Sequence, residues 1–152
     1  MCPGGAYYFL SMENESYNWV EYFNQQGIAV FIVKYRMTNG NLKVHVNDAE
    51  EGMRIVPRNA QKWNVNPKDV GIMGFSAGGH LASTIATHSK GDAQPNFHIL
   101  FYPVISMNPS YTHIISTNNF LGKNPKSKMI YEYSNELQVT NAILSIFTNV
   151  IF

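Results

Sequence analysis

A serine flanked by glycines in the middle of the chain limits the possible folds more than any other feature. Residues 70–88 have the sequence VGIMGFSAGGHLASTIATH, which opens with four residues suited to a buried strand. A glycine-rich turn follows, and then Leu81 and Ile85 lie four residues apart with alanines beside them, as on one face of a helix. The pattern predicts a strand, a sharp turn and a helix, which is the setting in which Gly-x-Ser-x-Gly presents a nucleophile.

Ser76 is the candidate nucleophile of this corner. The turn is strained, so the residues two positions away on each side must lack bulk, and Gly74 and Gly78 satisfy this condition. The Ser76 hydroxyl would project above the sheet, and the N–H of Ala77 would point from the helix N-terminus toward a developing oxyanion. The pattern alone also occurs in ordinary loops, so the prediction depends on the strand and the helix that flank it.

Two phosphate-binding motifs and a zinc site are excluded by the residues present. A P-loop needs Gly-Lys-Ser/Thr at the start of the helix, where this chain has Gly79-His80-Leu81. A dinucleotide fingerprint needs Gly-x-Gly-x-x-Gly, which the segment 71–74 does not supply. The five histidines are scattered without the close spacing of a zinc site, so no metal is expected.

The composition indicates one globular domain, 1–152, in a reducing compartment. The 152 residues are 45% hydrophobic and 14% charged, which allows a sizeable core. The net charge is +1 without a basic run, so neither nucleic acid nor an anionic membrane is an expected partner. A single cysteine, Cys2, excludes an internal disulfide and fits the cytoplasm. The chain shows no long apolar span and no basic region before its first apolar residues, so neither a membrane helix nor a secretory signal is predicted.

The first residues contain a second glycine loop, Cys2–Tyr7, with the sequence CPGGAY. Adjacent glycines let a backbone approach a ligand closely and leave its N–H groups free to donate. Alone, the segment would be an ordinary turn. Together with the serine corner, it is predicted to form the second half of an oxyanion hole, in which the N–H groups of Gly5 and Ala6 join that of Ala77.

The remaining pattern alternates helices and strands. The expected elements are a helix over 11–26, a buried strand over 28–33, a helix capped by Asn47 and Glu50 with a kink between Met53 and Pro57, a strand over 97–102, short helices near 118–121 and 127–133, and a strand that includes 144–147. This alternation predicts an α/β fold, a three-layer sandwich with a mainly parallel sheet between helices. Residues 107–138 are expected to lie over the strand ends, where ligands bind in such sheets.

Four segments together resemble a known superfamily: 2–7, 33–36, 69–82 and 102–106. They are similar to α/β-hydrolases and, within these, to bacterial acetyl esterases of the acetylxylan-esterase-like and lipase/esterase-like type. The resemblance extends from the first residue to about Thr140. It implies that Ser76 is the nucleophile and that Gly5, Ala6 and Ala77 form the oxyanion hole. It also implies cofactor-free hydrolysis of small-molecule esters with short acyl groups, acetyl groups on sugars among them, and places His80 beside the corner rather than in the triad.

The chain departs from that family at both ends. Members of the family carry strands before the glycine loop, and they place a catalytic acid and then a histidine after the last two strands. Here the glycine loop opens the chain, and Asn149-Val150-Ile151 stands where the aspartate is expected. The resemblance therefore implies a partial α/β-hydrolase fold, truncated at both ends, with weak activity of its own. Two exposed apolar sheet edges would then favour self-association.

His113 is the substitute base that the sequence offers. A lone histidine in a loop is more often structural, because a general base also needs an orienting partner. His88 and Asp92 lie at the far end of the helix, and a helix of about 12 residues separates its ends by roughly 18 Å. Only His113, in the segment 107–138, can fold over the site.

Two other functions stay open at this point. A non-catalytic protein would keep the same pocket for binding or the same sheet for assembly. A serine peptidase of the prolyl-oligopeptidase type shares Gly-x-Ser-x-Gly-Gly, although it usually brings a propeller domain for which 152 residues leave no room.

Overall fold

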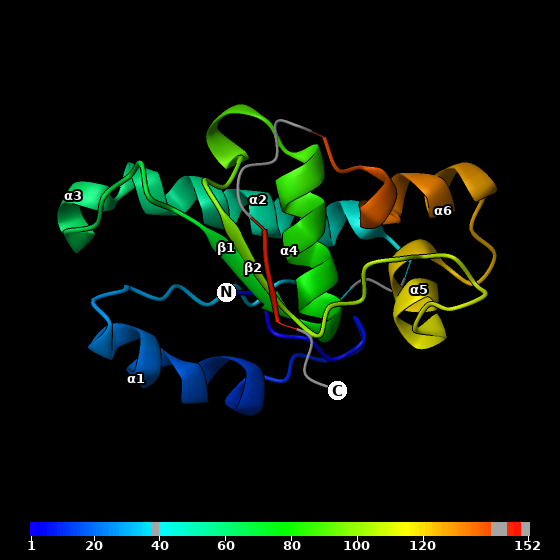
Figure 1. The fold of residues 1–152 in the computed structure, drawn as a ribbon, viewed down its shortest axis with the longest axis horizontal. Helices are drawn as coiled ribbons and strands as arrows, with labels where there is room; N and C mark the ends of the chain where they lie inside the picture. The colour runs from blue at the N-terminus through cyan, green and yellow to red at the C-terminus, as the bar shows by residue number, and fades with distance from the viewer. Residues whose placement is uncertain (38–39, 141–145, 150–152) are drawn as a thin grey trace.

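The described part of the chain is built around a parallel sheet. The computed structural model describes residues 1–37, 40–140 and, as backbone, 146–149. The strands are β1 (Ile72–Phe75), β2 (His98–Phe101) and β3 (Ile146–Asn149), paired in parallel in that order (Figure 1). The register places Gly74 opposite Leu100, and Leu100 opposite Thr148. The predicted parallel sheet is confirmed, and residues 144–145 of the predicted last strand lie outside the described residues.

The glycine loop at the start of the chain is joined to β1 on the side away from β2. Cys2 forms an isolated parallel bridge with Gly74. The Cys2 N–H donates to the Met73 carbonyl at 2.7 Å, and the Phe75 N–H donates to the Cys2 carbonyl at 3.2 Å. The loop therefore leaves the sheet at the same level at which β1 leads into the serine corner.

The predicted strand 28–33 lies next in line but is not a regular strand. The amino group of Met1 donates to the Phe31 carbonyl at 2.8 Å, and the Val33 N–H donates to the Met1 carbonyl at 3.0 Å. These bonds follow the pattern of a parallel pair, yet both are made to a single residue of the first segment, Met1. The prediction of a continuous strand over 28–33 is wrong for this reason, although Phe31 and Val33 bond to Met1.

Helices cover both faces of the sheet. On one face, α2 (Leu42–Arg58) and α4 (Ser76–His88) enclose a core that includes Ile72 and Leu100. On the other face, α1 (Asn18–Gln25) packs its aromatic side chains against Phe75, whose ring stacks on that of Phe101 at 4.6 Å. Full burial of one such large side chain is worth about 1.5–3 kcal/mol. The predicted three-layer α/β arrangement is therefore confirmed.

Helix α2 begins earlier than its predicted cap. It starts at Leu42, so Asn47 lies inside the helix and the predicted capping box is wrong. Leu42 and Val46 pack against the core and continue the apolar face backward, which outweighs the local preference of asparagine for a cap. The helix runs through Pro57 to Arg58 and breaks at Asn59, before the short α3 (Ala60–Trp63).

The predicted helix 11–26 is divided by a kink. A π-helical turn, η1 (Glu13–Tyr17), precedes α1, and Glu15 within it has non-helical angles of φ −113° and ψ 15°. The helix ends at Gln25, and Gly27 has the positive φ of 75° that commonly terminates a helix. The predicted end at residue 26 thus lies within one residue of the observed end, whereas the kink was not predicted.

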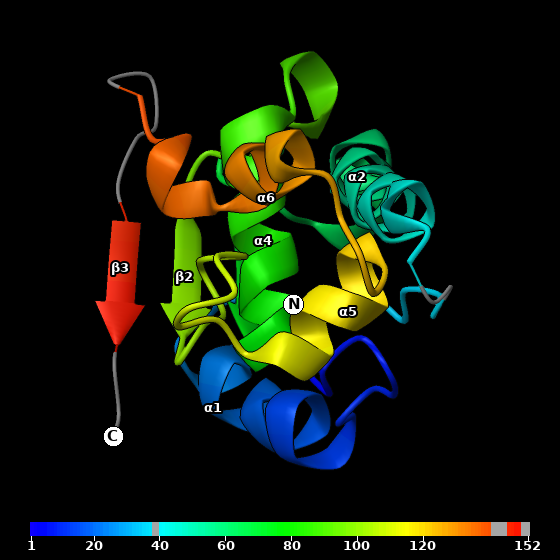
Figure 2. The same ribbon diagram turned by 90° about the vertical axis from the view of Figure 1, so that its right-hand side faces the viewer.

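The segment after β2 carries two further helices that pack on α4. These are α5 (Ile114–Leu121) and α6 (Ser127–Tyr133), followed by a 3₁₀ turn, η3 (Asn135–Leu137). Figure 2 shows both helices on the side of α4 that faces the viewer. The α6 bounds agree with the prediction, and α5 begins four residues before the predicted 118. Asn135 Nδ2 donates to Ser83 Oγ at 2.6 Å, which fixes the end of the segment to α4.

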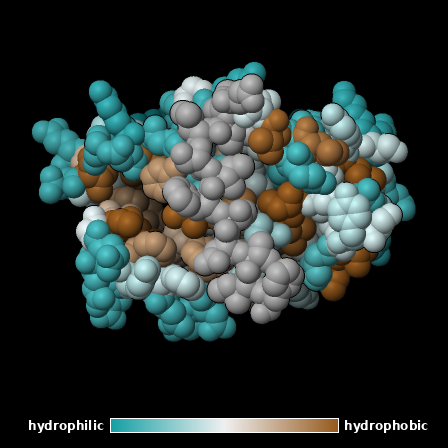
Figure 3. Space-filling view, in the orientation of Figure 1, coloured by the Kyte–Doolittle hydropathy of each residue, from teal (hydrophilic) through white to brown (hydrophobic). Residues whose placement is uncertain are grey.

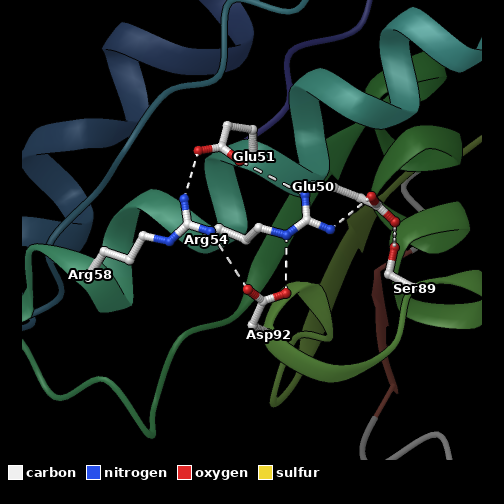
Figure 4. A network of polar contacts seen from close by, with 6 residues as sticks. All are labelled: Glu50, Glu51, Arg54, Arg58, Ser89 and Asp92. Carbon is white, nitrogen blue, oxygen red and sulfur yellow. Dashed lines mark hydrogen bonds and ion pairs between the residues drawn. The ribbon is translucent and has the colours of Figure 1, made fainter.

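Ion pairs attach α2 to the loop that follows α4. Asp92 lies in the 3₁₀ turn η2 (Gly91–Ala93). It forms ion pairs with Arg54 at 3.0 Å and with Arg58 at 3.6 Å (Figure 4). In the same group, Ser89 Oγ donates to Glu50 at 2.7 Å. Exposed ion pairs stabilise little individually, so the network serves mainly to fix the orientation of the two segments. None of the described helices combines the length and the apolar character that a membrane crossing requires.

Candidate active site

Ser76 occupies a strained corner between β1 and α4. It is half-buried and has a φ of 51°, in the left-handed region that costs a non-glycine residue about 1–2 kcal/mol. Its carbonyl accepts the Val104 N–H at 3.0 Å. Within the described residues, the Ser76 hydroxyl has no hydrogen-bond partner. The corner therefore holds its hydroxyl at a conformational cost without using it in the fold.

The glycines around Ser76 are required by contact. A Cβ on Gly74 would lie 2.1 Å from the Gly78 carbonyl oxygen, and a Cβ on Gly78 would lie 2.2 Å from the Cys2 carbonyl oxygen. A Cβ on Gly79 would lie 2.7 Å from Cβ of Pro103. These distances leave no room for a side chain, as the sequence predicted for Gly74 and Gly78. They also show that the start of α4 rests directly against the Cys2–Pro3 backbone.

The Cys2–Tyr7 loop touches the serine corner. A Cβ on Gly4 would lie 2.9 Å from Cβ of Ser76, so the two backbones are in contact there. The loop then passes through three consecutive residues with positive φ, namely Gly5 at 124°, Ala6 at 55° and Tyr7 at 57°. Such conformations persist only where the surrounding structure determines them, and they gather at functional sites.

The N–H groups predicted to bind an oxyanion are free in this arrangement. Within the described residues, the N–H groups of Gly5 and Ala6 donate to no acceptor. Ala77 is the second residue of α4, where a helix leaves its N–H groups without an internal partner. The helix N-terminus adds a partial positive charge at the same place. The structure thus brings Ser76, Ala77 and the loop together, as the sequence predicted.

Buried or half-buried side chains hold the loop by hydrogen bonds. The Tyr35 hydroxyl donates to the Pro3 carbonyl at 2.5 Å, and Asn119 Nδ2 donates to the Ala6 carbonyl at 2.9 Å. The Tyr7 hydroxyl lies 2.8 Å from Nδ1 of His80. Burial raises the pKa of Tyr7 and of Tyr35 well above the ordinary value, so both phenols stay neutral donors.

His80 is a neutral supporting residue of the loop. Its Nε2 lies 2.8 Å from the Tyr133 carbonyl, which can only accept, so Nε2 carries the proton and Nδ1 accepts from Tyr7. Burial lowers the pKa of His80 to about 4, and the ring is therefore uncharged near pH 7. Both ring nitrogens are engaged away from Ser76, in accord with the place that the resemblance gives this residue.

Two residues that the sequence did not single out complete the corner. Glu15 Oε2 accepts the Gly4 N–H at 2.7 Å, and Glu15 Oε1 accepts the Tyr102 hydroxyl at 2.8 Å. Tyr102 follows β2 directly and has a φ of 34°. Desolvation, and then the Glu15 carboxylate, raise the pKa of the Tyr102 phenol. The position of Tyr102 at a strand end was a signal for a site residue, because ligands of parallel sheets bind there, whereas nothing in the local sequence signalled such a role for Glu15.

His113 lies at the start of α5 and is exposed. Its Nδ1 lies 2.8 Å from Ser116 Oγ, and no described hydrogen bond joins it to Ser76. It lines a hollow of about 430 Å³ together with Val104, whose N–H holds the Ser76 carbonyl. Its role as a base stays a prediction. The described residues include no group of three His, Cys, Asp or Glu side chains that could hold a metal ion.

An apolar cavity of about 540 Å³ lies away from the serine corner. It is lined by one side of α2, by the beginning of β1, by the segment 27–33, by the end of α3 and by the residue before β2, among them Phe31, Trp63 and Phe97. Figure 3 shows apolar side chains around this hollow on the left of the view. Ligands of parallel sheets bind at the opposite ends of the strands, so this cavity is not the candidate site.

Comparisons with known proteins agree on one group of relatives. The BD-FAE family model matches residues 1–141. An acetylxylan esterase from Xylanibacter ruminicola is 50% identical over 148 residues, which are 96% of this chain and 30% of that protein. Endo-1,4-beta-xylanase B from Butyrivibrio fibrisolvens is 31% identical over 152 residues, which are 90% of this chain and 24% of that protein. The chain thus spans less than a third of the curated relatives that it matches.

Solved structures share the fold. An acetyl ester-xyloside bifunctional hydrolase from Caldicellulosiruptor lactoaceticus has a TM-score of 0.88 at 30% identity, over 96% of this chain and 57% of that one. The carboxylesterase Cest-2923 from Lactobacillus plantarum has a TM-score of 0.77 at 20% identity, over 98% of this chain and 57% of that one. The strand–serine–helix corner, the parallel sheet and these likenesses lead to one assignment: the chain belongs to the BD-FAE family and has a partial α/β-hydrolase fold.

Proposed function

We propose that this chain carries the nucleophile and the oxyanion-binding groups of a serine ester hydrolase. The substrates would be esters with short acyl groups, acetyl groups on sugars among them. The observation that carries the proposal is the Ser76 hydroxyl, left without a partner at a left-handed corner in contact with a glycine loop. A relative at 50% identity named acetylxylan esterase supports the choice of substrate.

In the proposed reaction, Ser76 Oγ attacks the carbonyl carbon of the ester. As the new C–O bond forms, the electron pair of the carbonyl moves to its oxygen, which accepts hydrogen bonds from the N–H groups of Gly5, Ala6 and Ala77. A base takes the Ser76 proton during this attack. The electron pair then returns, the bond to the alcohol oxygen breaks, and the alcohol leaves with the proton that the base gives up. Water attacks the acyl group by the same steps, and this releases the acid and restores Ser76.

The proton of Ser76 needs an acceptor, and no described hydrogen bond joins its hydroxyl to one. His80 has both ring nitrogens engaged, and His113 bonds to Ser116. In a well-studied serine protease, loss of the catalytic histidine lowers turnover by about 10⁶-fold. We therefore expect slow acylation of Ser76 by this chain, with His113 as the candidate base.

Covalent labelling tests the proposal without requiring turnover. A fluorophosphonate should attach to the wild-type chain and not to Ser76→Ala. Ser110→Ala, at an exposed serine in a turn, is the matched control and should be labelled like the wild type.

Equal labelling of the wild type and Ser76→Ala would contradict the proposal. Equal hydrolysis of p-nitrophenyl acetate by the two proteins would favour the alternative in which the pocket only binds. A mass spectrum of the labelled peptide containing residues 74–79 identifies the modified residue directly.

A further inference from the structure

Glu15 binds two segments that are distant from each other in the sequence. Its Oε2 accepts the N–H of Gly4, 11 residues away, at 2.7 Å. Its Oε1 accepts the hydroxyl of Tyr102, 87 residues away, at 2.8 Å. Both oxygens of one carboxylate are thus committed, one to the glycine loop and one to the residue that follows β2.

Both segments adjoin the nucleophile. A Cβ on Gly4 would lie 2.9 Å from Ser76 Cβ and 2.8 Å from Glu15 Oε2, so the carboxylate and the serine approach the same glycine. The ring of Tyr102 lies 6.0 Å from that of Phe75, the residue before Ser76. A single half-buried side chain therefore links the two backbone segments at the corner.

The local backbone explains how Glu15 reaches them. The kink in η1 falls on Glu15 itself, with φ −113° and ψ 15°. A regular helix over 11–26 would place residue 15 in an ordinary helical turn, whereas the kink directs its carboxylate to the loop. The hydrogen bonds of an ionised carboxylate are about twice as strong as neutral ones, so this link can hold a strained segment.

The loop needs such a link because its conformation is unfavourable alone. The residues that follow Gly4 are Gly5, Ala6 and Tyr7, each with positive φ. Fixing the Gly4 N–H fixes the peptide plane that precedes the two proposed donor groups. We propose that Glu15 is a positioning residue that holds the Gly4–Ala6 loop and Tyr102 in register with Ser76. This inference rests on the proposed function, because the loop matters there as the oxyanion-binding element.

Glu15 would act by holding the loop rather than by touching the substrate. A free carboxylate beside a developing oxyanion would disfavour it, but both oxygens of Glu15 already accept hydrogen bonds. Glutamine can keep both contacts: its oxygen accepts from Gly4, and its amide donates to the Tyr102 oxygen. Alanine loses both contacts, so the pair of variants separates positioning from charge.

The test measures the rate at which a fluorophosphonate labels Ser76 in four proteins. Glu15→Ala should lower the rate about tenfold or more, since displacing oxyanion donors costs less than the 10²–10³-fold of removing one. Glu15→Gln should restore the rate to within about threefold. Glu13→Ala, at an exposed glutamate on the same turn, is the control and should match the wild type.

Amide resonances give a second measure that does not depend on reactivity. In ¹H–¹⁵N spectra, the signals of Gly4, Gly5 and Ala6 should move in Glu15→Ala and stay close to the wild type in Glu13→Ala. Labelling of Glu15→Ala at the wild-type rate would overturn the inference, as would unmoved Gly5 and Ala6 signals. If Ser76 is labelled in none of the proteins, the proposed function fails, and the amide signals alone then decide whether Glu15 positions the loop.

Discussion

The glycine loop beside Ser76 is tightly bound into the fold, whereas the candidate base has no described hydrogen bond to the serine corner. The loop is tied to β1 through Cys2, to Tyr35 through the Pro3 carbonyl, and to Asn119 through the Ala6 carbonyl. By contrast, the base that the sequence offers, His113, is exposed and bonds to Ser116 of its own helix.

This difference separates two tasks of an esterase. The binding of a developing oxyanion depends on backbone N–H groups, which must be fixed before the reaction begins. Proton transfer needs a side chain within hydrogen-bond reach of the nucleophile, and such contacts often tighten only when substrate is bound. Among the described residues, the N–H groups proposed for the first task belong to a loop that the fold holds in place, and the second task has only His113 as a candidate.

The largest effect is expected at the contact between α4 and the loop. Gly78→Ala would place a methyl group 2.2 Å from the Cys2 carbonyl, which should lower the free energy of unfolding by about 3 kcal/mol or more. Gly27→Ala is the control: no atom lies within 4 Å of its Cβ position, and only its positive φ should cost about 1 kcal/mol. Urea unfolding measures both variants. Equal losses would show that the contact with the loop is not tight.

The second effect is a dependence of stability on pH that originates in His80. Its pKa is about 4 in the folded chain and near 6.5 when exposed, so the unfolded state binds more protons between these values. The free energy of unfolding should therefore fall by about 3 kcal/mol as the pH falls from 6.5 to 4. Urea unfolding at pH 7 and pH 4.5 should show a smaller fall in His80→Gln, which does not titrate. The same fall in both proteins would assign the effect to other groups.

The third prediction concerns His113, the candidate base. If His113 is the base, His113→Ala should lower the rate of Ser76 labelling about 100-fold, the usual lower limit for general base catalysis. The thermal midpoint should change little, because His113 is exposed. Labelling at the wild-type rate would remove His113 from the mechanism and leave no candidate base among the described residues.

The smallest effect is expected for one hydrogen bond beneath the loop. Tyr35→Phe removes the hydroxyl that donates to the Pro3 carbonyl and leaves that carbonyl unpaired, at a cost of about 2 kcal/mol. Tyr131→Phe, on an exposed tyrosine, should stay within about 0.5 kcal/mol of the wild type. Thermal unfolding of the two variants gives the comparison. No difference between them would mean that the loop is held without Tyr35.

The sequence predicted those parts of the molecule whose causes are local. The corner around Ser76 follows from a short spacing of glycines and serine, and the α6 bounds follow from the residues of that helix itself. The strand before the corner was predicted two residues early, at 70–73 instead of Ile72–Phe75, because an apolar run does not show where pairing begins.

The parts that were missed depend on contacts between distant segments. The bonds from Glu15 to Gly4 and Tyr102 join three segments, so no local pattern shows them. The segment 28–33 has the composition of a strand, yet its pairing is limited by what its neighbour offers. The early start of α2 had a signal in Leu42 and Val46, which the asparagine at 47 obscured.

The left-handed conformation of Ser76 also sets stability against reactivity. Glycine adopts such a φ without steric cost, so Ser76→Gly would relieve a local cost of about 1–2 kcal/mol. A redesign guided by thermostability alone would select that substitution and would delete the hydroxyl on which the proposed chemistry depends.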